Sequence, residues 1–160
     1  MTDQLSRPEL PNIGIVAEMD EDERRLLSSY GEFLPGHKDA VIIQQGEPQN
    51  SLFLIISGLL HVQTEAEGRK ILLGTLKAGD MLGEINIFDP AEASATVTAV
   101  EFSQIWRIDR DMLEDFLNDY PSEGELLLIQ ICTQLSQRLR ATNLKLTEAQ
   151  ESNSQSATWN

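Results

Sequence analysis

The chain has 160 residues, 41% of them hydrophobic, and its 26 acidic residues outnumber 12 basic ones, for a net charge of −14. This length and composition suit one folded domain with a single core. The negative charge repels nucleic-acid backbones and acidic membrane surfaces, and so argues against direct DNA or membrane binding. The single cysteine, Cys132, excludes an internal disulfide and a thiolate-rich metal site. Without a long apolar run or a secretory signal, we expect a cytoplasmic protein.

The first part of the chain is polar and is interrupted by Pro8 and Pro11. This composition predicts a flexible N-terminal arm over residues 1–16, followed by one folded domain over residues 17–149. Four acidic residues, Asp20 to Glu23, follow Met19 and precede Arg24 and Arg25. Acids before cations match the dipole of a helix, which predicts a short helix at about residues 20–30.

Between Val41 and Ile108 the sequence consists of short apolar runs separated by turns that contain glycine. This spacing predicts an antiparallel arrangement of about seven or eight strands, and it argues against helix. The apolar runs cover residues 41–43, 52–56, 59–63, 71–73, 95–100 and 102–108. The last run alternates at Phe102, Gln104, Trp106 and Ile108. The predicted fold is mainly β with flanking helices: an antiparallel β-roll of the double-stranded β-helix or jelly-roll type.

Two helices are predicted after the strands. Asp109 is placed to cap a short helix that ends before Pro121, and good helix formers then continue over about residues 122–149. One side of this long helix carries residues spaced alternately by four and three: Leu128, Cys132, Leu135, Leu139, Thr142 and Leu146. Such a seam favours pairing with a second copy, so we expect a homodimer; the alternative is that the stripe only covers the roll. Residues 150–160 are rich in Ser, Asn and Gln, which predicts a disordered tail.

Several short blocks in this order resemble the cyclic nucleotide-binding domain family, which includes the catabolite activator protein and the regulatory subunits of cAMP-dependent protein kinase. The likeness extends over about residues 20–146. Its blocks are Gln45-Gly46-Glu47, Leu52 to Gly58, Gly79 to Ile85, Ala95-Thr96-Val97 and Ile108 to Asp111.

In that family the segment starting at the Gly-Glu pair is the phosphate-binding cassette, which corresponds here to residues 83–96. The resemblance implies that Gly83 lets the backbone approach the sugar and that Glu84 accepts a hydrogen bond from the ribose 2′-hydroxyl. It further implies that the amides of Ile85 and Asn86 face the phosphate. These roles agree with the chemistry of glycine, carboxylate and free amides at a helix start.

The cassette departs from the family pattern at one position. Members that bind cAMP carry an arginine that pairs with the cyclic phosphate, and Ala93 stands at that position here. Loss of a bidentate charged pair weakens binding by a factor on the order of a hundred or more. Ser94 keeps the neighbouring hydroxyl, and Ala95 completes the site implied by the resemblance.

On the long helix, Thr142 and Asn143 resemble a pair that contacts the adenine in the catabolite activator protein; the alternative is that they are ordinary polar positions of the seam. Three interpretations of the pocket therefore stay open: weak binding of a cyclic nucleotide such as cAMP or cGMP, a different nucleotide ligand, or a pocket kept only as structure.

No pattern of catalytic residues is present, and His37 and His61 form no metal-binding set. We therefore expect no enzyme activity, no metal and no cofactor. The helix-turn-helix domain that the activator branch carries after the long helix is not expected here. The predicted function is a non-enzymatic sensor or regulatory module with weakened or altered nucleotide binding and a protein partner. The alternative is a ligand-free scaffold that docks a partner through its acidic surface.

Overall fold

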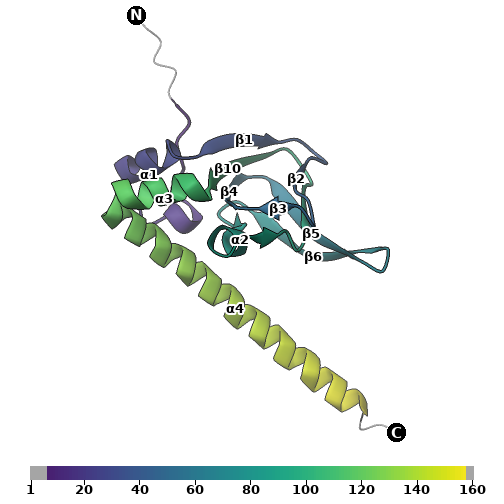
Figure 1. Cartoon of the computed structure of the whole chain (residues 1–160). Coiled ribbons are helices and arrows are strands. Elements are labelled where there is room, and N and C mark those ends of the chain that lie inside the picture. Colours follow the sequence, from purple (N-terminus) through teal and green to yellow (C-terminus); the bar gives the residue numbers. More distant parts are fainter. Residues whose placement is uncertain (1–6, 158–160) are drawn as a thin grey trace, which may run out of the picture.

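A computed structural model describes residues 7–157, and in it two antiparallel sheets face each other with helices against one side (Figure 1). The first sheet has the order β1-β10-β4-β7 and the second β2-β9-β5-β6, while β3 and β8 form a separate pair. The strands are β1 (Glu32–Gly36), β2 (Val41–Ile43), β3 (Pro48–Gln49), β4 (Ser51–Ser57), β5 (Leu59–Ala66), β6 (Arg69–Lys77), β7 (Met81–Leu82), β8 (Ala91–Glu92), β9 (Thr96–Ala99) and β10 (Ser103–Asp109). The predicted antiparallel roll is confirmed.

The helices are η1 (Gly14–Val16), α1 (Glu21–Ser28), α2 (Glu84–Phe88), α3 (Arg110–Asp119) and α4 (Pro121–Ala157). The predicted short helix near residues 20–30 is α1, which begins with a capping box between Asp20 and Glu23. Asp109 caps α3 as predicted, because its carboxylate accepts from Met112 N at 2.9 Å. These caps fix where the chain changes from one element to the next.

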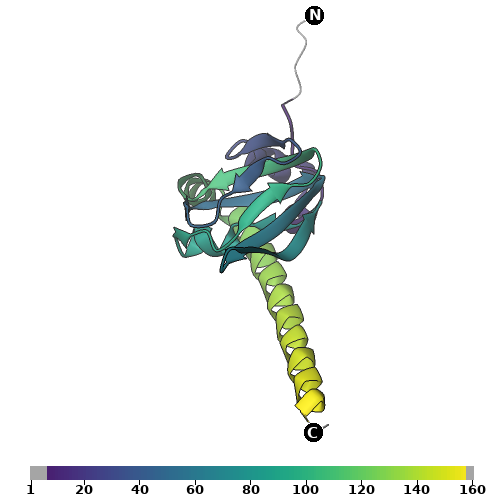
Figure 2. The ribbon, with the colours of Figure 1, turned by 90° about the vertical axis from the view of Figure 1, so that its right-hand side faces the viewer.

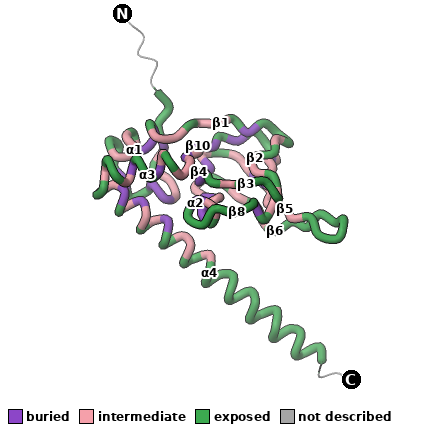
Figure 3. Tube along the Cα trace, in the orientation of Figure 1, coloured by how far each residue is buried: buried purple, intermediate pink, exposed green. Residues whose placement is uncertain are grey.

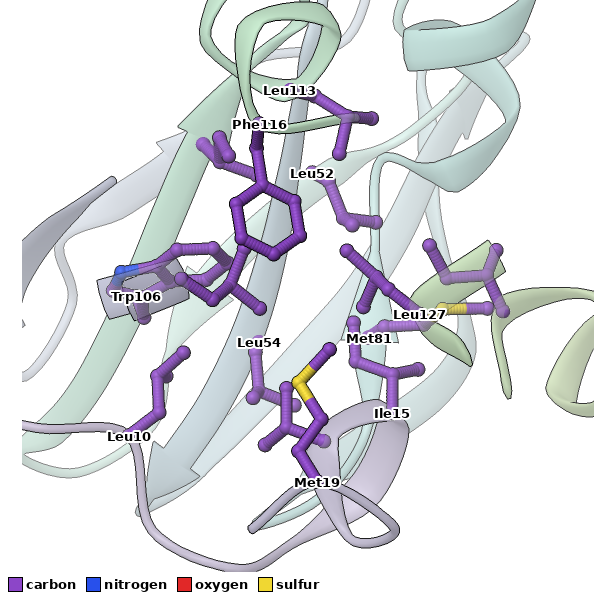
Figure 4. Packing of buried hydrophobic residues seen from close by; sticks show 14 of the residues in the cluster. Leu10, Ile15, Met19, Leu52, Leu54, Met81, Trp106, Leu113, Phe116 and Leu127 are labelled. Atoms are coloured by element: carbon purple, nitrogen blue, oxygen red, sulfur yellow. The ribbon is translucent and has the colours of Figure 1, made fainter. Parts of the chain in front are cut away.

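Strand β4 is buried on both faces, which explains its unbroken run of apolar residues. Leu52 and Leu54 point toward the helices, whereas Phe53 and Ile55 point between the two sheets. The helix-side core also takes Trp106 from β10, and side chains from η1, α3 and α4 close over it (Figure 4). The second sheet closes the core between the sheets, mainly with Leu60 and Val97.

The predicted alternation along the last strand is only partly correct. Trp106 and Ile108 are buried, but Phe102 is exposed and lies before β10 begins. The register of β10 against β4 shifts between Gln104 and Ile105. After this shift the alternation is regular, so Ile105 fills the core between the sheets and the next residue, Trp106, enters the helix-side core.

The prediction of a flexible arm over residues 1–16 is wrong for residues 7–16, the part of it that the structure describes. Leu10, Ile15 and Val16 are buried in the helix-side core. Ser28 Oγ accepts a hydrogen bond from Leu10 N at 2.9 Å, and the side chain of Arg24 donates to Leu10 O at 3.1 Å. These contacts attach the segment to α1. Residues 1–6 lie outside the described residues.

Helix α4 begins on the core and then leaves it. Leu127 and Ile131 are buried, whereas every residue from Leu139 to Ala157 is exposed (Figure 3). In the view turned by 90° the helix still extends away from the roll (Figure 2). The predicted disordered tail is wrong for residues 150–157, which continue the helix; residues 158–160 lie outside the described part.

Candidate functional site

A hollow of about 180 Å³ lies where β7, the start of α2 and the segment before β9 meet. Seven of the predicted site residues, Gly83 to Asn86 and Ala93 to Ala95, line it together. Apolar side chains of the roll form its floor: Ile43, Val62, Leu76, Met81, Leu82 and Val97. One lining residue comes from far along the chain, Arg138 of α4. The structure thus joins the predicted cassette to the long helix.

Gly83 stands at the N-cap of α2 with φ 80°, in the left-handed region. A Cβ there would overlap the carbonyl oxygen of Ser51 in β4. Glycine is therefore required at this turn by the backbone of the fold itself. Its predicted role, close approach to a sugar, remains an expectation beside this structural reason.

Glu84 and Arg138 form an ion pair in the pocket wall. Arg138 Nη1 donates to Glu84 Oε1 at 2.6 Å, and Arg138 Nη2 donates to the carbonyl oxygen of Met81. The Glu84 side chain is only 9% exposed, whereas that of Arg138 is 39% exposed. A carboxylate this buried needs a partner, and the guanidinium supplies it. The pair connects α4 to the cassette.

The amides that the resemblance assigns to the phosphate lie in the first turn of α2. Ile87 N donates to Gly83 O at 3.0 Å, which is the first bond of the helix. The amides of Ile85 and Asn86 precede this bond, as the first amides of any helix do. The side chain of Asn86 is already engaged, because Nδ2 donates to Ala91 O at 3.2 Å.

The other end of the cassette is held by backbone bonds. Ala93 N donates to Glu47 O at 2.8 Å, and Ala93 O accepts from Gly46 N at 2.8 Å. Ala93 is 6% exposed and lines the hollow, so a methyl group forms this part of the pocket wall. None of the three acids near the cassette, Asp80, Asp89 and Glu92, lines the hollow.

Residues 36–120 match the model of the family described as "Cyclic nucleotide-binding domain". This match covers more than half of the chain and includes the whole predicted cassette. The chain belongs to the cyclic nucleotide-binding domain family.

Two curated relatives show how such a domain is used elsewhere. The CRP-like cAMP-activated global transcriptional regulator of Mycobacterium tuberculosis is 35% identical over 118 residues, which are 73% of this chain and 50% of that protein. The cGMP-dependent protein kinase egl-4 of Caenorhabditis elegans is 32% identical over 95 residues, 59% of this chain and 12% of the kinase. The chain therefore spans half or less of these relatives.

Solved structures agree on the fold. A cyclic nucleotide-binding domain from Methylobacillus flagellatus superposes with a TM-score of 0.76 at 24% identity, covering 82% of this chain and 74% of that chain. The catabolite activator protein of Thermus thermophilus superposes with a TM-score of 0.74 at 25% identity, covering 85% of this chain and 62% of that chain. Both support the family's β-roll with a long C-terminal helix.

Two residues of the cyclic nucleotide-binding site proposed from sequence do not join the pocket within this chain. Thr142 and Asn143 are exposed on α4, beyond the point where the helix leaves the roll. They do not line the hollow. Their contact with a ligand remains an expectation.

Arg138 was not predicted as a site residue, although it lines the hollow. It is separated from Glu84 by 54 positions, so no local motif joins the two. One signal was available: Arg138 lies four residues before Thr142, hence one turn earlier on the same helix face.

The predicted dimer seam has a mixed environment in this cyclic nucleotide-binding domain. Leu135 packs against the helix-side core, whereas Leu139 and Leu146 are 62% and 58% exposed. Leu128 and Cys132 line an open groove of about 720 Å³ on α4. One part of the stripe covers the domain and the rest has no partner within the described chain.

Two further classes of site were sought in the described residues. In residues 7–157 no group of three or more His, Cys, Asp or Glu side chains is arranged to hold a metal ion. None of the helices over the same range combines the length and apolar content needed to cross a bilayer.

Proposed function

We propose that this domain is a non-enzymatic regulatory sensor whose pocket binds the phosphate of a cyclic nucleotide weakly. The observation that carries the proposal is the convergence of Gly83 to Asn86 and Ala93 to Ala95 on one hollow that Arg138 closes. Weak binding is expected because the methyl group of Ala93 occupies the position where the resemblance places an arginine. Each lost charged hydrogen bond is worth about 1.5–3 kcal/mol.

The size of the hollow supports the same conclusion. Ligand pockets usually measure about 300–1,000 Å³, and this one measures about 180 Å³. A nucleotide therefore requires the wall to move. Arg138 is the movable part, because its side chain is half-exposed and belongs to a helix that leaves the domain directly after it.

This geometry gives the sensor an output. A ribose hydroxyl that donates to Glu84 competes with Arg138 for the same carboxylate. Ligand binding and the position of α4 are then coupled. A ligand shifts the equilibrium between two positions of the helix by the difference in its binding free energy for the two. We propose that the shifted helix changes the geometry of a homodimer or the surface presented to a protein partner.

Calorimetry with cAMP, cGMP and a cyclic dinucleotide tests the proposal. Wild-type protein is expected to bind one of them weakly and saturably, and Ala93→Arg is expected to tighten cAMP binding by about a hundredfold. Ala91→Arg is the matched control, since it adds the same charge on exposed β8 outside the hollow. Equal affinity in the two arginine variants would contradict the assigned role of position 93.

A second function is favoured by the satisfied state of the pocket. Glu84 already has its partner, and the chain carries a net charge of −14. Both fit a ligand-free scaffold that docks a basic protein through its acidic surface. Two results together would favour the scaffold over the sensor. None of the three nucleotides would bind to wild-type protein or to Ala93→Arg, and a basic protein would be captured in a way that weakens with added salt.

A further inference from the structure

The β5–β6 hairpin projects beyond the rest of its sheet (Figure 1). Strand β9 pairs with β5 only from Leu60 to Gln63. Past that point β5 and β6 continue as a two-stranded ribbon, which turns at Glu67 and Gly68. A ribbon of two strands has no third strand on either edge and gains little stability by itself.

Three consecutive large apolar side chains lie on β6 where the two-stranded ribbon begins: Ile71 is on the ribbon, and Leu72 and Leu73 come directly before it on the sheet side. Ile71, Leu72 and Leu73 are 47%, 53% and 59% exposed. Because neighbouring residues of a strand point to opposite faces, Ile71 and Leu72 offer apolar surface on the two sides of β6, and Leu73 lies at the register shift between β5 and β6. The fold does not need these side chains for its core, which already takes Leu76 from the same strand. Contiguous exposed apolar surface at a sheet edge is typical of a docking site.

The charge of β6 is opposite to that of the whole chain. In nine residues it carries Arg69, Lys70 and Lys77 and no acid, whereas the net charge of the chain is −14. None of these three cations takes part in an ion pair among the described residues. Glu65 lies opposite Lys70 across the ribbon, and the Asp80 carboxylate accepts from Lys77 N at 2.9 Å, so each of these two cations has one acid nearby.

The same charges disfavour the symmetric pairing of two copies of β6 and favour a partner of opposite charge. Strand β6 is an edge strand, with only β5 beside it in the sheet order. If two copies of β6 paired antiparallel around Leu73, Arg69 of one would lie opposite Lys77 of the other. Like charges directly opposite are destabilising in a sheet. An acidic strand would meet the same two positions with opposite charge.

We propose that β6 is the docking site for an extended, acidic segment of a partner protein that carries bulky aliphatic side chains. The segment adds to the free edge of β6 by backbone hydrogen bonds. Its aliphatic side chains cover Ile71 on one face and Leu72 on the other. Its carboxylates pair with Arg69, Lys70 and Lys77. The proposal does not depend on whether the nucleotide pocket is occupied.

The test is selection of a random-peptide phage library on the whole chain, followed by fluorescence anisotropy with the best synthetic peptide. Selected peptides are expected to be enriched in Asp, Glu and aliphatic residues. The double variant Ile71→Thr/Leu72→Thr keeps β-compatible side chains and is expected to weaken binding by about tenfold or more. Lys70→Glu is also expected to weaken peptide binding, and the loss of affinity is expected to be larger at low salt than at high salt.

Val41→Thr is the matched control, because Val41 is 53% exposed on β2 at the opposite edge of the same sheet. It is expected to leave peptide affinity unchanged. The proposal is overturned if no peptide is enriched, if the enriched peptides are basic, or if the hairpin variants bind as tightly as Val41→Thr. It is also overturned if sedimentation shows self-association that the double variant abolishes, since the occupant would then be a second copy.

Discussion

Replacing Arg138 by methionine tests the ion pair that joins α4 to the pocket. The substitution keeps an apolar stem but removes both donors, so that Glu84, whose side chain is 9% exposed, loses its charged partner and Met81 O loses a donor. A charged hydrogen bond contributes about 1.5–3 kcal/mol, and the 39% exposure of Arg138 places this pair at the lower end. We expect a loss of about 2 kcal/mol. In a domain of this size that lowers the Tm by roughly 4–8 °C, measured by circular dichroism.

A double-mutant cycle isolates the pair itself. Glu84→Gln combined with Arg138→Met is expected to cost less than the two single changes together, with a coupling of about 1–2 kcal/mol. Arg140→Met is the control, because Arg140 is an exposed cation on the same helix and is expected to change stability by less than about 0.5 kcal/mol. If Arg138→Met behaves like Arg140→Met, or if the cycle is additive, the pair does not stabilise α4 against the pocket.

Three other predictions concern separate parts of the chain. Gly83→Ala should lower the free energy of unfolding, measured by chemical denaturation, by at least about 2 kcal/mol, because the added Cβ overlaps a backbone carbonyl. Gly68→Ala is the control, since Gly68 has a similar positive φ but open space around it, and should lower it by about 1 kcal/mol. Equal losses in the two variants would contradict the steric argument. The hydrogen bond from Tyr30 to Asp119 raises the pKa of Tyr30 to about 12. The stability that this hydrogen bond contributes is therefore complete below pH 10 and is lost as the pH rises from 10 toward 12. Absorbance titration should show a lower pKa of Tyr30 in Asp119→Asn, and an unchanged pKa would contradict the assignment. Sedimentation equilibrium should give twice the 17.9 kDa chain mass, and Leu139→Asp should halve it; a monomeric wild type would end the dimer proposal.

The sequence predicted the roll because its longer strands carry their own local signals. Strand β4 is an unbroken apolar run, since both of its faces are buried. Strand β1 was missed because it is short and contains Pro35 and Gly36, which normally argue against a strand. The proline is tolerated in β1 because β1 is an edge strand, paired only with β10.

The two ends of the chain were predicted less well, for different reasons. The segment before α1 is polar on average, yet Leu10, Ile15 and Val16 fill the core, and composition averages hide three well-placed side chains. The C-terminal segment was predicted to be disordered from its Ser and Gln content. Extending an existing helix is easier than starting one, and Ser152 and Ser156 bond to carbonyls one turn earlier in α4.

The candidate site divides in the same way. Gly83 to Asn86 and Ala93 to Ala95 lie on contiguous segments, so ordered motifs were sufficient to find them. Arg138 enters through the path of α4, which depends on how Leu127 and Ile131 pack on the core. Local spacing does not encode that path.

The position of Arg138 along α4 also determines how far the end of the helix would be displaced by a movement at the pocket. About 28 Å of straight helix separates it from Ala157, at 1.5 Å per residue. A change of about 10° in the direction of the helix at Arg138 would carry its far end sideways by about 5 Å. A shift at Glu84 too small to alter the roll is thus amplified at the end of the exposed helix.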